Sequence, residues 1–227
     1  MKVKAIWRYP VKTMTGEKLQ RVHIGPLGID GDRVVHVEDA LGRVITSRSH
    51  PRFLGHKGTL GPDGEPLVDN LPWNSPEVAA EVVNIVGPGA KLVRYDGIER
   101  FDVLPLLVAT DGAIAAFGHD CRRLRPNIVI GGVEGLAERE WPGGCLRIGK
   151  VLIGVQDLRL RCIMTSYHPD TLVQDKEVTR SIYRRFDGKL ALNCFVIEGG
   201  EITVDDKVQL MRDRACAESA AANVFAD

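Results

Sequence analysis

The sequence lacks the short motifs that identify several large enzyme classes. It contains no GxxxxGK(S/T) segment, no GxSxG segment and no GxGxxG segment after a predicted strand. A P-loop nucleotide site, an α/β-hydrolase nucleophile and a Rossmann dinucleotide site are therefore unsupported. The six histidines show neither HxH nor HExxH spacing, so the sequence predicts no zinc site.

Long apolar runs, CxxC pairs and an excess of either charge are also missing. No hydrophobic run approaches the roughly 18 residues that a membrane-spanning helix needs. The five cysteines form no CxxC pair, their number is odd, and the first residues do not form a signal peptide. This usage favours reduced thiols and a cytoplasmic protein over a disulfide framework. Because 30 Lys and Arg balance 30 Asp and Glu, we expect neither nucleic acid nor a membrane surface as a partner.

Short β-branched runs between Gly, Pro and Asp residues dominate the rest of the chain. They occupy residues 34–37, 43–46, 82–86, 91–95, 127–130, 146–148, 151–155, 193–197 and 208–210. Many short strands separated by turn residues predict a barrel or a sandwich rather than alternating βαβ units. Only two helices are predicted, over 110–117 after a capping Thr-Asp pair and over 177–186, where Gly188 would end the helix.

A weak domain boundary is predicted near residues 100–108. We expect an N-terminal β-barrel-like domain over 1–105, a second domain over 106–213 and a disordered tail over 214–227. The long loop 55–76 carries a Gly-Pro-Asp-Gly segment that indicates a hairpin tip or a surface excursion. The polar loop 164–176 starts two residues after Cys162, so we expect it to form part of a substrate entrance.

Cys162 follows two closely spaced arginines, Arg159 and Arg161. In an extended strand both arginines would lie on one face and Cys162 on the other, although a turn could bring all three together. Guanidinium charge nearby favours the thiolate, which is the form that attacks substrates and binds metals. The alternative is a buried structural cysteine at a strand end, because free cysteines are commonly buried as small apolar groups.

Polar and basic residues recur at other strand ends. Arg125 and Asn127 flank Pro126, and a residue before proline favours extended backbone, so we expect extended backbone at Arg125. The two polar side chains could form a rigid clamp for an anion, or they could simply be a polar start to a strand. Arg33 and Lys12–Thr13 also place basic or polar residues at the ends of predicted strands. Taken alone, each is typical of a charged residue in a solvated loop. These features indicate a thiolate, several strand-end cations and a barrel-like fold, but they specify no reaction.

Five segments in order resemble the MOSC family (molybdenum cofactor sulfurase C-terminal domain). They are Tyr9–Thr13, Gly28–Arg33, Ile45–Arg48, Arg125–Ile130, and Arg161–Ser166 with Pro169–Thr171. The likeness spans roughly residues 1–212 and is greatest to two-part members, such as amidoxime-reducing components and their bacterial relatives. It implies a mainly β (α+β) fold, in which a MOSC-type β-barrel packs with an N-terminal β-barrel-like segment and a few short helices.

The resemblance also implies a molybdenum cofactor, a pyranopterin whose dithiolene and one protein cysteine hold the metal. By motif position that cysteine is Cys162, as both metal ligand and catalytic residue. Cofactor contacts are implied at Lys12, Thr13, Arg33, Arg125, Asn127 and Arg161, while the helix start at Thr110, Asp111 and Gly112 could add backbone N–H groups. His168 stands where relatives are usually acidic, and it could transfer a proton or be a bystander.

Two functions from different classes follow from this resemblance. One is a molybdenum oxidoreductase that reduces N-hydroxylated small molecules by oxygen-atom abstraction. Its electrons would come from a separate flavin, haem or iron–sulfur donor protein, because the chain has no motif for such groups. The other is a carrier of sulfur or of the cofactor, in which Cys162 bears a persulfide or the ligand bond. A purely structural barrel is a third possibility.

Overall fold

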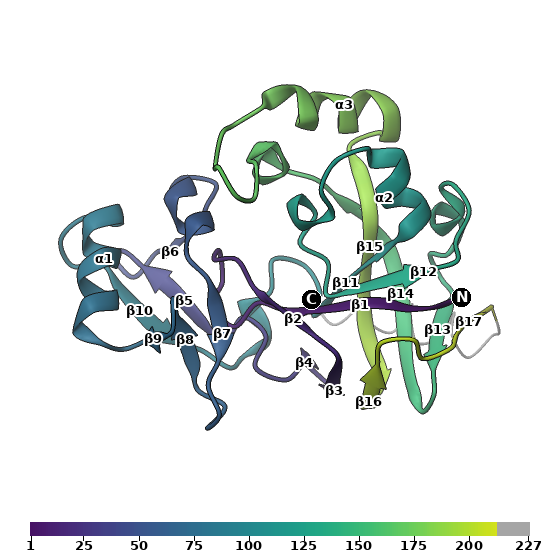
Figure 1. Cartoon of the computed structure of the whole chain (residues 1–227), viewed down its shortest axis with the longest axis horizontal. Coiled ribbons are helices and arrows are strands. Elements are labelled where there is room, and N and C mark those ends of the chain that lie inside the picture. The colour runs from purple at the N-terminus through teal and green to yellow at the C-terminus, as the bar shows by residue number, and fades with distance from the viewer. Residues whose placement is uncertain (213–227) are drawn as a thin grey trace.

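The computed structural model describes residues 1–212, so the tail predicted over 214–227 lies outside the described residues. The fold is mainly β with three short helices, α1 (Pro76–Val86), α2 (Asp111–Phe117) and α3 (Lys176–Phe186). Figure 1 shows a small lobe built from β5–β10 and α1 beside a larger body, whose sheet carries α2 and α3 at its upper end. The expected mainly β architecture with a few short helices is confirmed.

An eight-stranded sheet organises the larger body, in the order β17-β13-β14-β15-β11-β12-β1-β2. Its strands are β1 (Lys2–Arg8), β2 (Glu17–Leu19), β11 (Leu106–Thr110), β12 (Ile128–Gly131), β13 (Cys145–Ile148), β14 (Val151–Leu160), β15 (Lys189–Glu198) and β17 (Val208–Met211). Continuous pairing does not close this sheet into the expected barrel. A single isolated bridge between Lys2 and Lys207 joins the start of β1 to the residues before β17.

Three smaller sheets, each of three strands, complete the described fold. They comprise β10 (Lys91–Arg94), β5 (Val35–Glu38) and β6 (Val44–Ile45); β16 (Gly200–Thr203), β3 (Arg21–Gly25) and β4 (Gly28–Ile29); and β7 (Gly58–Leu60), β8 (Pro66–Val68) and β9 (Leu71–Pro72). Strands β1 and β2 belong to the large sheet and β3 pairs with β16, so hydrogen bonds cross the predicted 105/106 boundary. That boundary stays a prediction.

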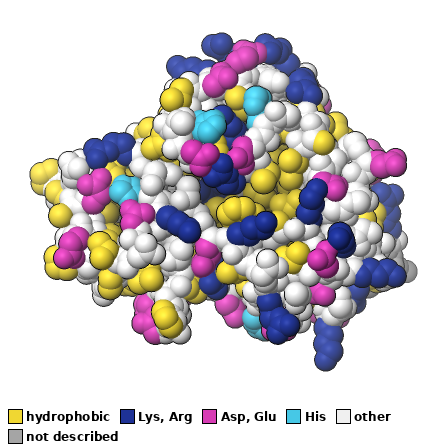
Figure 2. Space-filling model, in the orientation of Figure 1, with side chains coloured by type: hydrophobic (Ala, Val, Ile, Leu, Met, Phe, Trp, Pro, Cys, Tyr) yellow, Lys and Arg dark blue, Asp and Glu magenta, His cyan; other side chains and the backbone are white. Residues whose placement is uncertain are grey.

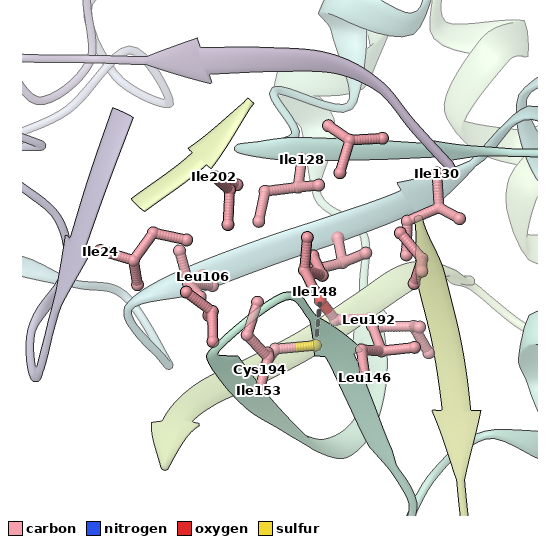
Figure 3. Close-up of a cluster of buried hydrophobic side chains, with 14 of the residues drawn as sticks. Ile24, Leu106, Ile128, Ile130, Leu146, Ile148, Ile153, Leu192, Cys194 and Ile202 are labelled. Atoms are coloured by element: carbon pink, nitrogen blue, oxygen red, sulfur yellow. Dashed lines mark hydrogen bonds between the residues drawn. The ribbon is translucent and has the colours of Figure 1, made fainter. Parts of the chain in front are cut away.

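The main core lies between the large sheet and the β16-β3-β4 sheet. Figure 3 shows isoleucine and leucine side chains from both sheets converging, among them Ile24, Ile128 and Ile202, each of which is fully buried. Cys194 belongs to this cluster, and its Sγ donates to the Leu192 carbonyl at 3.7 Å. Burial raises the pKa of the Cys194 thiol well above its ordinary value, so this cysteine is structural.

Two sequence predictions fail in particular places. Residues 82–86 form the end of helix α1 rather than a strand. The side chain of Ser75 caps α1 by accepting from the Val78 N–H, and Val78 and Val82 are buried one helical turn apart on the face that packs into the small lobe. Cys145 is disulfide-bonded, which corrects the expectation that all cysteines are reduced.

The loop predicted over 55–76 contains the three strands β7–β9, and its Gly-Pro-Asp-Gly segment forms the hairpin tip between β7 and β8. Both predicted helices are present, because α2 and α3 match 110–117 and 177–186 within a residue at either end. Asp187, in left-handed backbone, caps α3 directly before Gly188. Within residues 1–212, no helix is both long and apolar enough to cross a lipid bilayer.

We expect Ile128→Ala to lower the free energy of unfolding by about 2–5 kcal/mol, because the change leaves a cavity in a fully buried site between β1 and β11. Urea denaturation followed by circular dichroism measures the change. The control is Val44→Ala, at a half-exposed position of β6, for which a change within about 0.5 kcal/mol is expected. Equal losses in the two variants would contradict this picture of the core.

Candidate functional site

Cys162 lies where the long strand β14 turns away from the large sheet. The Arg161 N–H still donates to the Gly188 carbonyl at 2.8 Å, so the extended path continues to that residue. Cys162 then caps a short 3-10 turn (Ile163–Ser166), and its carbonyl accepts from the Thr165 N–H and hydroxyl. This turn brings Cys162 to the same cavity as Arg159 and Arg161. Its thiol is free and only partly buried, unlike the core thiol of Cys194.

The central cavity is a space of about 110 Å³ between the small lobe and the larger body. It is lined by Lys12, Thr13, Arg33, Thr46, Arg48, Asp102, Leu107, Arg123, Leu124, Arg125, Arg159, Leu160, Arg161, Cys162 and Met164. The lining thus contains seven cationic side chains but one carboxylate. It includes six of the predicted site residues, namely Lys12, Thr13, Arg33, Arg125, Arg161 and Cys162.

Asp102 is shared among three of the cations. One of its oxygens lies 2.9 Å from Lys12 Nζ, and the other lies 3.4 Å from Arg48 and 3.8 Å from Arg159. Burial opposes ionisation of this carboxyl, but the three positive charges outweigh burial and lower its pKa. One negative charge therefore serves three positive ones, and the cavity keeps a strong positive potential.

Arg161 is the most deeply buried of these cations, with 8% of its surface exposed. Its Nη2 donates to the Leu124 carbonyl at 2.7 Å, but its Nε has no hydrogen-bond partner. Burial, reinforced by the neighbouring charge of Arg159, lowers the pKa of Arg161 to about 10, so the group is still charged at neutral pH. A buried charge without a carboxylate partner is costly unless an anion binds beside it.

Arg33 and Arg125 lie over the same aromatic ring. Their guanidinium carbons are 5.1 Å and 4.4 Å from the ring centre of Tyr9, whose hydroxyl donates to the Pro126 carbonyl. Burial lowers the pKa of Arg125 and raises that of Tyr9, so the ring stays neutral between two cations. Cation–π contacts of this kind fix the direction of both arginines without neutralising them.

Three residues of the cavity wall have left-handed backbone, with φ values of 80° at Thr13, 57° at Arg33 and 55° at Arg125. Such values are uncommon outside glycine and strained for a β-branched residue. The extended geometry predicted for Arg125 is therefore wrong. Its N–H donates to the Arg122 carbonyl, and its side chain stacks on Tyr9, so these contacts outweigh the bias from the following proline.

Buried polar side chains hold these strained residues from behind. Ser47 is fully buried, its N–H donates to the Thr13 hydroxyl, and its own hydroxyl donates to the Thr13 carbonyl at 2.7 Å. Asp32 is also fully buried and accepts from the Tyr9 N–H, from Arg33 and from Asn127. These buried hydrogen bonds therefore fix the cavity wall through contacts within the protein.

Asn127, predicted to contact a ligand, takes part in this support instead of lining the cavity. Its Oδ1 accepts from the Leu107 N–H at 3.1 Å, and its Nδ2 donates to Asp32 and to the Trp7 carbonyl. The side chain is fully buried. Its polar atoms are therefore occupied within the protein.

The remaining predicted site residues lie apart from the cavity lining. Thr110 caps α2 through the Ala113 N–H, and Asp111 accepts from the N–H groups of Gly132 and Val133. The backbone at Gly112 packs closely against the 133–135 segment. Nδ1 of His168 accepts from the N–H groups of Asp170 and Thr171, which holds the turn in the loop after Cys162. A proton-transfer role for His168 stays a prediction.

Two wider hollows adjoin the central cavity. The outer hollow, of about 630 Å³, shares with the cavity Arg48, Asp102 and the run from Arg159 to Cys162. The side hollow, of about 540 Å³, shares Arg123, Arg125 and Met164. Figure 2 shows Lys and Arg side chains deep in a hollow at the centre of this face, below α3 and flanked by acidic and His side chains. Cys162 thus lies between the cationic cavity and the outer hollow.

Four charged residues of the cavity were not predicted as site residues from the sequence. They are Arg48, Asp102, Arg123 and Arg159. Each lies in a loop or at a strand end, where a charged residue is ordinarily solvated, so its type alone carries no signal. Within residues 1–212, no cluster of three or more His, Cys, Asp and Glu side chains is placed to hold a metal ion. A metal at Cys162 would need ligands from a bound cofactor.

Family models match both parts of the chain. A model of the MOSC N-terminal beta barrel domain matches residues 1–72, and a model of the MOSC domain matches residues 112–209. The chain belongs to the MOSC-domain family. The second match contains Arg125, Arg161 and Cys162, while the first contains Lys12, Thr13 and Arg33, so the cavity of this MOSC protein lies where its two matched domains meet.

Individual proteins similar to this chain share little sequence identity with it. The chain is 27% identical over 228 aligned positions to the human protein named mitochondrial amidoxime-reducing component 1, covering 89% of this chain and 59% of that protein. The crystal structure of the YuaD protein from Bacillus subtilis superposes with a TM-score of 0.51 at 13% identity, covering 92% of this chain and 94% of that one. This likeness supports the MOSC fold predicted from the sequence.

We expect Arg161→Met to raise the free energy of unfolding in anion-free buffer by roughly 1–3 kcal/mol, because it replaces a buried, unpaired charge with an apolar side chain of similar length. Added sulfate should then stabilise the variant less than the wild type, since an anion-binding group has been removed. Urea denaturation with and without sulfate measures both effects. Arg180→Met, at an exposed position of α3, is the control. A less stable variant with an unchanged sulfate response would contradict the role assigned to Arg161.

Proposed function

We propose that this MOSC protein is an oxidoreductase that binds a molybdenum cofactor through Cys162 and reduces N-hydroxylated small molecules. One observation carries the proposal. A free, partly exposed thiol borders a cavity whose seven cations include a buried arginine with an unpaired Nε. The arrangement suits a ligand that is anionic at one end and offers a soft metal to a thiolate at the other.

The residues present fit a phosphate-bearing pterin dithiolene with a metal. Lys12, Arg33 and Arg125 would bind the anionic part through charge-assisted hydrogen bonds, and buried Arg161 would gain the partner that its Nε lacks. Cys162 would provide the one protein thiolate, since no other cysteine among residues 1–212 lines the cavity. When bound, such a cofactor supplies a metal able to accept an oxygen atom from an N–O compound.

The likeness to the human relative supports the choice of substrate class. That protein is named for reducing amidoximes, which are N-hydroxylated compounds. The chain spans 59% of that protein's length, so its activity and partners are extended to this chain as part of the proposal. Since the sequence has no motif for flavin, haem or an iron–sulfur cluster, a separate redox protein would deliver the electrons. A cytoplasmic location belongs to the same proposal.

The chain's own residues have three tasks in this scheme. The cavity cations bind and orient the anionic end of the cofactor, and the left-handed backbone at Thr13, held by Ser47, keeps that wall in place. The turn after Cys162 holds its thiol at the edge of the cavity, where the outer hollow begins. Small molecules can therefore approach the thiol from the solvent side while the anionic end stays enclosed.

Replacing the proposed ligand should separate this function from its alternatives. We expect Cys162→Ser to abolish reduction of amidoximes and to change the electronic spectrum of bound molybdenum, because a hard hydroxyl replaces a soft thiolate. Elemental analysis, ultraviolet–visible spectroscopy and turnover with a small-molecule reductant measure these effects. The control is Cys121→Ser, which alters another free, partly buried thiol outside the cavity lining. Full activity and an unchanged spectrum in Cys162→Ser would refute the proposal, and a persulfide on metal-free wild type would favour the carrier.

The cavity cations should act on cofactor occupancy rather than on substrate affinity. A charged hydrogen bond contributes about 1.5–3 kcal/mol, so Arg125→Ala should weaken cofactor binding by about ten- to a hundredfold. Molybdenum content measured after dialysis should fall, and the remaining activity should follow it in proportion. Arg180→Ala on α3 is the matched control, because Arg180 is an exposed arginine outside the cavity lining. Full occupancy with a raised KM would instead assign Arg125 to the substrate.

A further inference from the structure

The rim of the outer hollow is formed by large apolar side chains that are well exposed to solvent. Its rim consists of Val103, Leu160, Ile163 and Tyr183, whose exposed fractions are 53%, 58%, 39% and 50%. These four come from the 95–105 segment, the end of β14, the turn after Cys162 and helix α3, so distant parts of the sequence meet here. Large apolar side chains gathered around one opening mark a binding site more often than a single exposed residue does.

Tyr183 and Leu160 meet over a glycine at this rim. A side chain added at Gly188 would come within 2.9 Å of the Tyr183 ring and 3.2 Å of Leu160 Cδ1, so the absence of one lets both groups converge. The Tyr183 hydroxyl donates to the Arg161 carbonyl at 3.1 Å, directly before Cys162. The ring is therefore fixed beside the residue that carries the thiol, and one of its faces or edges remains open to solvent.

The outer hollow also has more cations than carboxylates, but it adds a second carboxylate, Asp157, to the Asp102 that it shares with the central cavity. Asp102 interacts with Arg48 and Arg159, and Asp157 accepts from Asn193 at 2.6 Å. The volume of about 630 Å³ lies within the range of small-molecule pockets, which combine apolar walls with a few polar groups. The exposed apolar rim suits a ligand with an uncharged, apolar body, because a charged group packed against these side chains would lose hydration without gaining a partner.

We propose that the outer hollow is the substrate site, and that Tyr183 and Leu160 select N-hydroxylated compounds with a flat, uncharged, apolar body. The inference rests on the proposed function and narrows it, because small hydroxylamines and N-hydroxylated nucleotides lack such a body or carry phosphate. The aromatic ring and the leucine side chain give the apolar body a surface on which to pack, while the N–O group points toward Cys162.

The experiment compares benzamidoxime with acetamidoxime, which share the N–O group but differ in the apolar body. Turnover is driven by reduced methyl viologen, so no donor protein is needed. Leu160→Ala should lower kcat/KM for benzamidoxime about fivefold and Tyr183→Ala about tenfold, with little change for acetamidoxime. Tyr183→Phe keeps the ring and should preserve the ratio between the two substrates. Leu41→Ala, which shortens an exposed leucine far from the hollow, is the matched control.

The ratio of kcat/KM for benzamidoxime to kcat/KM for acetamidoxime separates substrate selection from damage to the enzyme. A disturbed Cys162 or a loss of cofactor would lower kcat/KM for both substrates equally and leave the ratio unchanged. Equal losses for both amidoximes, or an unchanged ratio, would overturn the inference. Calorimetric titration of benzamidoxime is independent of turnover. If no variant reduced either compound but Leu160→Ala weakened this binding about fivefold, the proposed function would fail and the binding site would stand.

Discussion

Like charges repel, and the central cavity holds seven cationic side chains beside one carboxylate. Arg161 carries the largest cost, because burial removes water without supplying an anion. The residues around the cavity hold these cationic side chains close together despite their repulsion. The Tyr9 ring separates and directs two of the guanidinium groups, and Asp32 neutralises Arg33 from behind rather than from inside the cavity. Arg33 is thus paired with Asp32, while the other six cations of the lining share the single carboxylate Asp102 and leave positive charge for a ligand.

The same requirement explains where the backbone is strained. Thr13, Arg33 and Arg125 adopt left-handed φ values, and each presents its residue to the cavity from a separate segment. Left-handed backbone at such residues costs on the order of 1 kcal/mol or more and persists where surrounding contacts enforce it. At Thr13 the enforcing contacts are the buried hydrogen bonds with Ser47, and at Arg125 they are the turn bond to Arg122 and the stacking on Tyr9. The stable cores on either side supply the free energy that this strain consumes.

The β-rich fold and the helices α2 and α3 could be predicted from the sequence, because they depend on local patterns. The position of Cys162 beside Arg159 and Arg161 was one of two alternatives that the sequence left open. The sequence does not predict α1, since a run of valines favours a strand until the Ser75 cap and the buried Val78–Val82 pair are seen in three dimensions. The sequence also favours extended backbone at Arg125, and it does not mark Arg48, Asp102 or Arg123 as site residues, because the purpose of such charged residues is visible only once the chain brings them together. The polarity of Asn127 at a strand start indicates a structured role, and in the structure its side chain supports the cavity wall instead of lining the cavity.

Cys162 marks the border between two chemically different spaces. Inside, seven cations surround one carboxylate; outside, a second carboxylate is present and the rim is apolar. A single thiol with access to both can hold a group whose anionic end is enclosed while its reactive end faces the solvent side. Two such adjoining spaces allow an anionic molecule to bind tightly in the cavity while an uncharged molecule exchanges in the outer hollow. The electrostatic attraction that retains the anion does not act on the uncharged molecule. The turn that follows β14 contributes to the division, since it carries the chain from Cys162 at the cavity wall to Ile163 at the rim.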